Sequence, residues 1–342
     1  MPIAISLALS LAVMPLARYL GLRTGLVDRP GLGALKIHPS PVPILGGPAA
    51  LAAVIVALAV TADLGVALTV GVCLGVAVGL ADDVRSLPAF PRVVVIGLAG
   101  AIASGASIHS IDAPVAILLG MLLGIACANG VNLVDGQDAL AGGLAVIAAL
   151  AMAAAGTVLG VPSGPAIGLA LSGGLIGFLV WNRPPARIFL GNGGAYGVGL
   201  LLSVQASFLV ANGSRGLAAA ALCLGPFAFE ILTTVARRLG SRESIVAGDR
   251  RHTYDVLAER RGSRGQATAI LWGLGAVCGG LGVLAAALTE PAAVAIASTC
   301  AVLALGAGLS LIRRGARGTN VERHTFAAGR RTPPRLDPRG GA

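Results

Sequence analysis

Long apolar runs recur along the chain, and they constrain its fold more than any other feature. A membrane-spanning helix needs about 20 apolar residues. Runs near that length occupy residues 2–20, 45–61, 64–80, 93–108, 113–128, 139–160, 164–181, 194–211, 216–235, 267–288 and 291–312. Because lipid leaves backbone groups no partner but the chain itself, such runs must be helical. We predict an all-α, polytopic transmembrane helix bundle of about eleven helices over residues 1–312.

The basic residues indicate how the bundle is oriented. Charged residues make up only 12% of the 342, against about a quarter in soluble proteins. Nearly all Lys and Arg residues lie in the loops after the first, third, seventh and ninth segments or beyond Ile312, whereas Arg215 lies on the opposite side. Since basic loops stay in the cytoplasm, we expect the N-terminus outside and the C-terminus inside. The net charge of +10 is then a topology signal, and no nucleic-acid partner is expected. The basic tail 313–342 is expected to be disordered.

An acidic pair, Asp82 and Asp83, ends the third apolar segment. Adjacent carboxylates at a membrane boundary repel each other unless a cation or a proton intervenes. The pair therefore suits a divalent metal or a general base. A solvated helix end followed by Arg85 is the open alternative.

A second polar cluster separates two apolar segments. Asn129, Asn132, Asp135 and Asp138 follow one another at intervals of three, which on a helix lines one face with amides and carboxylates. Gly136 would interrupt that helix. Four polar groups between two spans indicate a ligand site, with a structural hydrogen-bond network as the alternative.

A third cluster runs from Trp181 to Gly194. It offers Asn182, Arg187, Asn192 and a glycine-rich turn before an apolar segment. Glycines let backbone N–H groups approach an anion, and guanidinium groups match phosphate geometry. Alternatively, the arginines only anchor the topology.

A fourth cluster, Asp249, Arg250, Arg251 and His252, lies in the largest basic loop, which could also hold a short helix around 255–261. Its charges make phosphate binding plausible.

Glu230 is an acid inside an apolar segment and is therefore a functional candidate. Pairing with Arg237 or Arg238 at the boundary is an equal alternative.

These clusters resemble the polyprenyl-phosphate N-acetylhexosamine-1-phosphate transferases, glycosyltransferase family 4. That family includes bacterial undecaprenyl-phosphate N-acetylglucosamine-1-phosphate transferase and phospho-N-acetylmuramoyl-pentapeptide transferase. The resemblance follows residues 27–30, 36–47, 82–83, 129–143, 185–191 and 249–252 in order. Its most specific parts are Asn-Leu-Val-Asp-Gly at 132–136 and the stretch 36–47.

The resemblance implies transfer of N-acetylhexosamine 1-phosphate, expected to be GlcNAc 1-phosphate, from a UDP-sugar to a polyprenyl phosphate in cell wall or polysaccharide biosynthesis. It implies catalytic roles for Asp82 and Asp83 and Mg²⁺ (alternatively Mn²⁺) on Asp83 and Asn192. Where Asn192 stands, the family usually has a metal-binding Asp. The implied substrate-binding residues are Lys36, His38, Asn129, Asn132, Asp135, Asp138, Asn182, Arg187, Phe189, Asp249, Arg250, Arg251 and His252.

The expected partners are the UDP-sugar, the polyprenyl phosphate and the lipid bilayer, with a homodimer left open. The site is expected at the cytoplasmic face of the cell (inner) membrane. Two alternatives compete with an active transferase. One is an impaired relative that binds substrates without turnover, because Asn192 removes a charge. The other is a transporter, although transporter sites usually lie near mid-bilayer.

Overall fold

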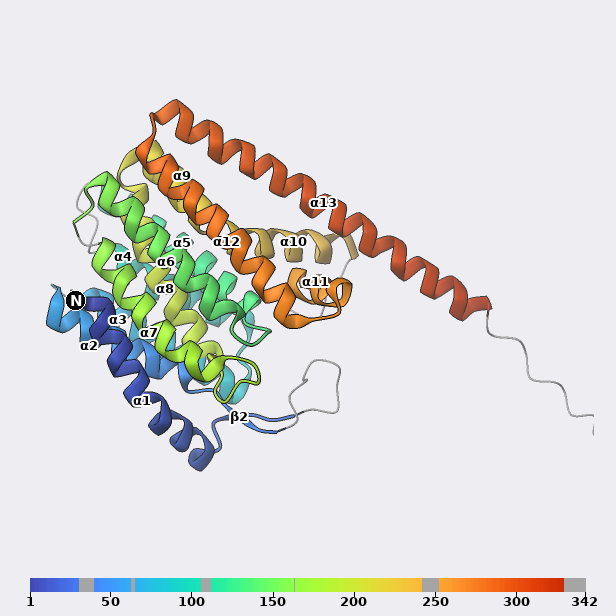
Figure 1. Cartoon of the computed structure of the whole chain (residues 1–342), viewed down its shortest axis with the longest axis horizontal. Coiled ribbons are helices and arrows are strands. Elements are labelled where there is room, and N and C mark those ends of the chain that lie inside the picture. Colours follow the sequence, from blue (N-terminus) through green and yellow to red (C-terminus); the bar gives the residue numbers. More distant parts are fainter. Residues whose placement is uncertain (31–39, 63–64, 106–111, 163, 242–251, 329–342) are drawn as a thin grey trace, which may run out of the picture.

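The computed structural model describes residues 1–30, 40–62, 65–105, 112–162, 164–241 and 252–328. Within these ranges the chain forms thirteen helices and a two-stranded antiparallel sheet (Figure 1). The helices are α1 Pro2–Thr24, α2 Gly46–Thr61, α3 Val66–Arg85, α4 Ala89–Gly105, α5 Ala113–Val134, α6 Leu140–Leu159, α7 Gly164–Asn182, α8 Gly191–Val210, α9 Gly213–Cys223, α10 Gly225–Ser241, α11 Thr253–Arg261, α12 Arg264–Ala287 and α13 Glu290–Ala328. The strands are β1 Val27–Asp28 and β2 Val42–Pro43.

The helices have the length and composition of a multi-pass membrane protein. In the described residues, eight are long and apolar enough to cross a bilayer, and α9 with α10 make a ninth if that bent pair is one span. The remaining apolar helices, α2 and α4, have 16 and 17 residues. The prediction of a polytopic all-α membrane protein is confirmed, whereas the orientation stays a prediction.

One expected segment is not a single helix. Residues 216–235 fall on α9 and α10, which meet at a break and differ in direction by 67°. Pro226 follows the break, and proline cannot donate the backbone hydrogen bond that would continue a helix. The break turns α10 away from the bundle axis, toward the short helix α11 (Figure 1).

Helix α8 forms the centre of the bundle. Most of its apolar side chains are buried, and those of Tyr196, Leu200 and Leu201 are fully so. Small residues bring its neighbours close to its backbone: a Cβ on Gly199 would lie 2.4 Å from the Ala128 Cα of α5. Such close approach stabilises helix pairs in lipid, where apolar burial drives no association.

The outermost helices present apolar side chains outward. Helix α13 runs along the edge of the molecule (Figure 1), and its Val302 and Leu303 are each 67% exposed. Lipid tails would cover these side chains in a bilayer. Helix α13 continues to Ala328, through the first half of the expected tail, and residues 329–342 lie outside the described ranges.

Extended segments from two loops meet at one end of the bundle. The Phe189 N–H donates to the Pro43 carbonyl at 2.7 Å, and the N–H groups of Gly46 and Gly47 donate to the carbonyls of Phe189 and Leu190 at 3.1 Å each. These bonds fix β2 and the first residues of α2 against the chain before α8. Residues more than 140 positions apart in the sequence are therefore neighbours at this end of the bundle.

Candidate active site

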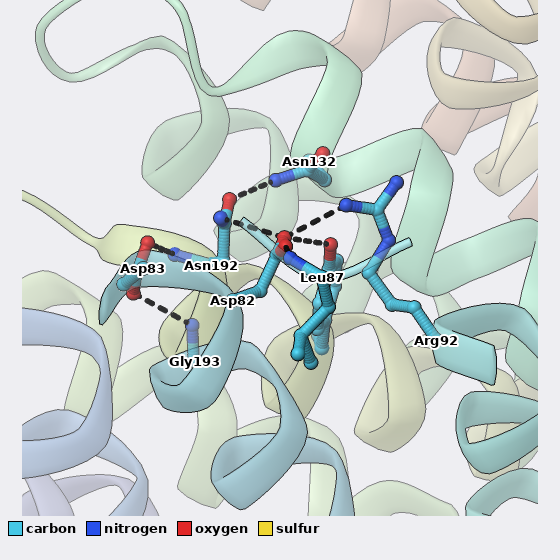
Figure 2. A network of polar contacts seen from close by, with 8 residues as sticks. Asp82, Asp83, Leu87, Arg92, Asn132, Asn192 and Gly193 are labelled. Carbon is cyan, nitrogen blue, oxygen red and sulfur yellow. Dashed lines mark hydrogen bonds and ion pairs between the residues drawn. The ribbon is translucent and has the colours of Figure 1, made fainter. Parts of the chain in front are cut away.

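Asp82, in the last turn of α3, is buried and bound by four donors. Its Oδ2 accepts hydrogen bonds from Arg92 Nη1 at 2.8 Å, Asn192 Nδ2 at 3.0 Å and the Tyr196 hydroxyl at 3.2 Å. Its Oδ1 accepts from the Leu87 N–H at 2.8 Å (Figure 2). Asp82 is therefore not a solvated helix end. The Arg92 guanidinium balances its charge and the other donors fix its orientation.

Asp83 faces the start of α8. Its Oδ1 accepts from the Asn192 N–H at 3.1 Å, and its Oδ2 accepts from the Gly193 N–H at 3.4 Å (Figure 2). The N-terminus of a helix favours negative charge because its first N–H groups lack partners within the helix. Gly79 permits this approach, since a Cβ there would lie 2.5 Å from the Asn192 carbonyl.

Asn192 joins three helices. Its backbone N–H binds Asp83, its side-chain NH₂ binds Asp82, and its Oδ1 accepts from Asn132 Nδ2 at 2.6 Å. The first three polar clusters of the sequence therefore meet at this residue, from α3, α5 and α8. An amide suits the position because it donates toward a carboxylate and accepts from another amide at the same time.

The turn between α5 and α6 adds two acids beside this centre. Helix α5 ends at Val134, so Asp135 and Asp138 lie in the turn rather than on one continuous helical face. Loss of solvent, followed by repulsion from the charges of Asp83 and Asp138, raises the pKa of Asp135 well above its usual range. Asp138 Oδ2 accepts the Ala186 N–H at 2.9 Å. Three carboxylates thus influence one another at this end of the bundle.

Asn182, the last residue of α7, forms hydrogen bonds that hold the same turn. Its Oδ1 accepts the Ala139 N–H and its Nδ2 donates to the Ile188 carbonyl, each at 2.9 Å. Ala139 has a φ of 63°, a left-handed conformation that is costly for a residue with a Cβ. The buried Asn182 amide therefore stabilises a strained turn, and both its oxygen and its nitrogen form hydrogen bonds within the protein.

Three further expected binding residues, Asn129, Arg187 and Phe189, lie within the described residues. Asn129 donates to the Ile125 carbonyl of its own helix at 2.8 Å. Arg187 is exposed in the loop before α8, and Phe189 is half-buried beside it. Lys36, His38, Asp249, Arg250 and Arg251 lie outside the described residues.

His252 contacts Glu230 and Tyr254, and Tyr254 connects it with this end of the bundle. Its Nδ1 lies 2.8 Å from Glu230 Oε1, and its ring stacks on Tyr254 with centroids 5.3 Å apart. The Tyr254 hydroxyl covers Gly136, where a Cβ would lie 2.0 Å from the hydroxyl oxygen. The fourth cluster is thereby connected to the turn that carries Asp135.

The sequence patterns do not indicate the site roles of Arg92 and Tyr196. In the sequence, Arg92 is one of the basic residues that indicate topology, and it is also the first cation of α4, the helix that follows the acidic pair. Tyr196 lies four residues after Asn192, so both side chains share one face of α8. The expected short helix near residue 255 is confirmed as α11.

The acids fit a metal that is shared with a substrate. In the described ranges, no group of three or more His, Cys, Asp or Glu side chains is arranged to hold a metal ion. Mg²⁺, however, commonly binds through one or two carboxylates together with substrate phosphates. Asp83 and the desolvated Asp135 repel each other, and a shared cation would relieve that repulsion.

Comparison with known proteins agrees with this arrangement. The family described as "Glycosyl transferase family 4" matches residues 65–210, which run from the start of α3 to the end of α8. The matched region therefore carries Asp82, Asp83, Asn132, Asp135 and Asn192.

Curated relatives carry phosphotransferase names. A Thermotoga maritima "Undecaprenyl-phosphate alpha-N-acetylglucosaminyl 1-phosphate transferase" is 37% identical over 39% of this chain and 40% of its own length. A Symbiobacterium thermophilum "Phospho-N-acetylmuramoyl-pentapeptide-transferase" is 32% identical over 47% and 48%. A Mycolicibacterium smegmatis "Decaprenyl-phosphate N-acetylglucosaminephosphotransferase" is 27% identical over 75% and 74%.

The chain spans less than half the length of the first two of these relatives and about three quarters of the third. The matches follow the same bundle that carries the polar centre. They show that residues 65–210 of the chain are similar to glycosyl transferase family 4.

Proposed function

We propose that this protein transfers an N-acetylhexosamine 1-phosphate, GlcNAc 1-phosphate, from a UDP-sugar to a polyprenyl phosphate and releases UMP. The observation that carries the proposal is the meeting of α3, α5 and α8 at Asn192, which gathers amides and carboxylates beside Asp83 and Asp135. The names of the relatives support this reaction class and its place in cell-envelope glycan synthesis.

The reaction joins two anions. An oxygen of the lipid phosphate attacks the sugar-bearing phosphorus of the donor diphosphate, a new P–O bond forms, and the P–O bond to UMP breaks with its electron pair on UMP. A bound divalent cation, held by Asp83 and Asp135 with Asn192 Oδ1 as a further oxygen ligand, would neutralise the diphosphate charge. Catalysis of this kind depends mainly on positioning and electrostatic stabilisation.

The protein's own residues supply the positioning. The N–H groups of Asn192 and Gly193 orient the Asp83 carboxylate. The Asn132 amide is fixed by Asn192 at the end of α5, next to the turn with Asp135. Asp82, bound to Arg92, holds the Asn192 side chain in place.

We also propose that this end of the bundle faces the cytoplasm, at the inner membrane. The connections after α3 and α7, which carry site residues, are basic, and basic loops remain inside. A position at one end of the helices suits a donor from the aqueous side and an acceptor from the bilayer. Transporter sites, in contrast, usually lie near mid-bilayer on broken helices.

The test is turnover by the purified protein in lipid nanodiscs with Mg²⁺, a polyprenyl phosphate and UDP-GlcNAc, with UDP-GalNAc and UDP-MurNAc-pentapeptide as alternative donors. UMP and lipid-linked product should appear together. Asp83→Asn should abolish both. Asp112→Asn is the matched control, because Asp112 precedes α5 at the end opposite Asp135. Donor binding without UMP release in the wild type would refute the proposal.

A further inference from the structure

Glu230 is a buried acid in the broken span. It lies in α10 and is 4% exposed. An ionisable side chain in an apolar segment is costly and needs a partner or a function. The sequence offers Arg237 and Arg238 as partners, but the structure shows the carboxylate beside the His252 imidazole, with Oε1 and Nδ1 2.8 Å apart.

The same carboxylate holds the beginning of α11. The Thr253 N–H lies 3.3 Å from both Glu230 oxygens, and the Thr234 hydroxyl lies 3.4 Å from Oε1. The first N–H groups of a helix lack partners within the helix, and a carboxylate is a favourable acceptor for them. Glu230 therefore fixes both the imidazole and the backbone that carries it.

The contact also determines which His252 nitrogen can act elsewhere. An ionised carboxylate only accepts hydrogen bonds, so an imidazole that binds ionised Glu230 donates from Nδ1. Any contact between the ring and a substrate must then be made through Nε2. Stacking on Tyr254, with an interplanar angle of 5°, restricts rotation of the ring.

Tyr254 connects this pair with the acidic turn. Its hydroxyl lies over Gly136, the residue that follows Asp135. Glu230, His252 and Tyr254 thus form a continuous contact from α10 through α11 to the turn between α5 and α6. Movement of Glu230 would be transmitted to the edge of the candidate site.

We infer that Glu230 is a positioning residue that fixes the tautomer and orientation of His252, so that His252 meets the donor diphosphate through Nε2. The part concerning the diphosphate rests on the proposed function. Glu230 itself lies behind the imidazole, engaged with His252, Thr253 and Thr234. A carboxylate in that place orients a group that touches substrate, as acids behind metal-binding or catalytic imidazoles do.

The first test is ¹⁵N-histidine NMR of the full chain in nanodiscs, with His252→Gln to assign the signal among the four histidines. In the wild type, Nδ1 of His252 should carry the proton. Glu230→Leu should shift His252 toward the Nε2-protonated tautomer that an unconstrained histidine side chain prefers, whereas Thr233→Val should leave it unchanged. Thr233 is a fair control because its hydroxyl bonds carbonyls of its own helix. An Nδ1-protonated His252 in Glu230→Leu would overturn the inference.

The second test is a double-mutant cycle on turnover. Glu230→Leu should lower kcat/KM by about tenfold or more in the wild type, as loss of a group that orients a ligand does. In a His252→Gln background the same change should lower kcat/KM by less than about twofold, because the imidazole that Glu230 orients is already absent. Equal losses in both backgrounds would indicate a merely structural role and overturn the inference. An inert wild type would refute the proposed function, while the tautomer would still decide the role of Glu230.

Discussion

The ion pair between Arg92 and Asp82 yields the sharpest prediction about what holds the site together. Their nearest atoms are 2.8 Å apart, and their side chains are 20% and 6% exposed respectively. Arg92→Met keeps the apolar stem but removes the guanidinium. Asp82 would then be a buried carboxylate with three uncharged donors, from Leu87, Asn192 and Tyr196.

The size of the effect follows from burial and from the donors that remain. Removing one partner of a buried ion pair costs about 3–5 kcal/mol when the other charge is left uncompensated. The three retained donors stabilise the carboxylate, so we expect a smaller cost than that range, about 2–3 kcal/mol. Asp82→Asn should cost less, about 1–2 kcal/mol, because Arg92 is partly exposed and water can reach it.

The assay is equilibrium unfolding in mixed micelles of increasing denaturing-detergent content, followed by circular dichroism. The double variant Asp82→Asn/Arg92→Met should cost less than the sum of the single variants by at least about 1 kcal/mol. Arg85→Met is the matched control, since Arg85 is exposed in the same turn of α3, and it should stay within about 0.5 kcal/mol of the wild type. Additive single effects, or an Arg92→Met variant as stable as Arg85→Met, would refute the reasoning.

Three further predictions follow from other contacts. Gly136→Ala should lower turnover and the apparent Tm, because its Cβ would lie 2.0 Å from the Tyr254 hydroxyl oxygen, and Tyr254→Phe should restore part of both; no rescue would contradict the packing. Asn192→Asp should destabilise the protein by about 1–3 kcal/mol in the same unfolding assay, since it replaces a donor to Asp82 with a second carboxylate; a stabilised variant would show that the amide is not required. Asp135→Asn should increase the free energy of unfolding at neutral pH but abolish turnover. Folding raises the pKa of the Asp135 carboxyl, which therefore binds its proton more tightly in the native state than in the unfolded state. The free energy of unfolding of the wild type should then fall as the pH rises above 3.8. The free energy of unfolding should therefore change less with pH in Asp135→Asn than in the wild type. Identical pH dependences would count against the burial of this acid.

The bundle could be predicted from sequence because lipid leaves few choices. Long apolar runs must become helices in a bilayer, so each predicted segment overlaps an apolar helix. The division of 216–235 into α9 and α10 could have been suspected from Gly225 and Pro226. Hydropathy alone could not show this division, because a bent helix pair and a straight helix of the same sequence have the same mean hydropathy.

The site was only partly predictable, for a different reason. Spacing showed which polar residues were costly to leave in lipid, and the structure brings Asp82, Asp83, Asn132 and Asn192 together. Spacing could not show which of them face one another. Asn182 could be read as a ligand-binding amide, but its partners are the left-handed Ala139 and the Ile188 carbonyl, which only the folded turn brings within reach. Glu230 likewise pairs with a residue 22 positions away, across a loop that sequence periodicity does not place.

The most direct measurement follows the sugar-bearing phosphorus. UDP-GlcNAc with a radiolabelled β-phosphate, incubated with the wild-type protein and a polyprenyl phosphate, distinguishes transfer of the sugar phosphate from transfer of the sugar alone. The geometry around Asp83, Asn132 and Asn192 predicts that the label enters the lipid product while UMP leaves unlabelled. Label recovered in UDP, or retained entirely in the donor, would contradict the account.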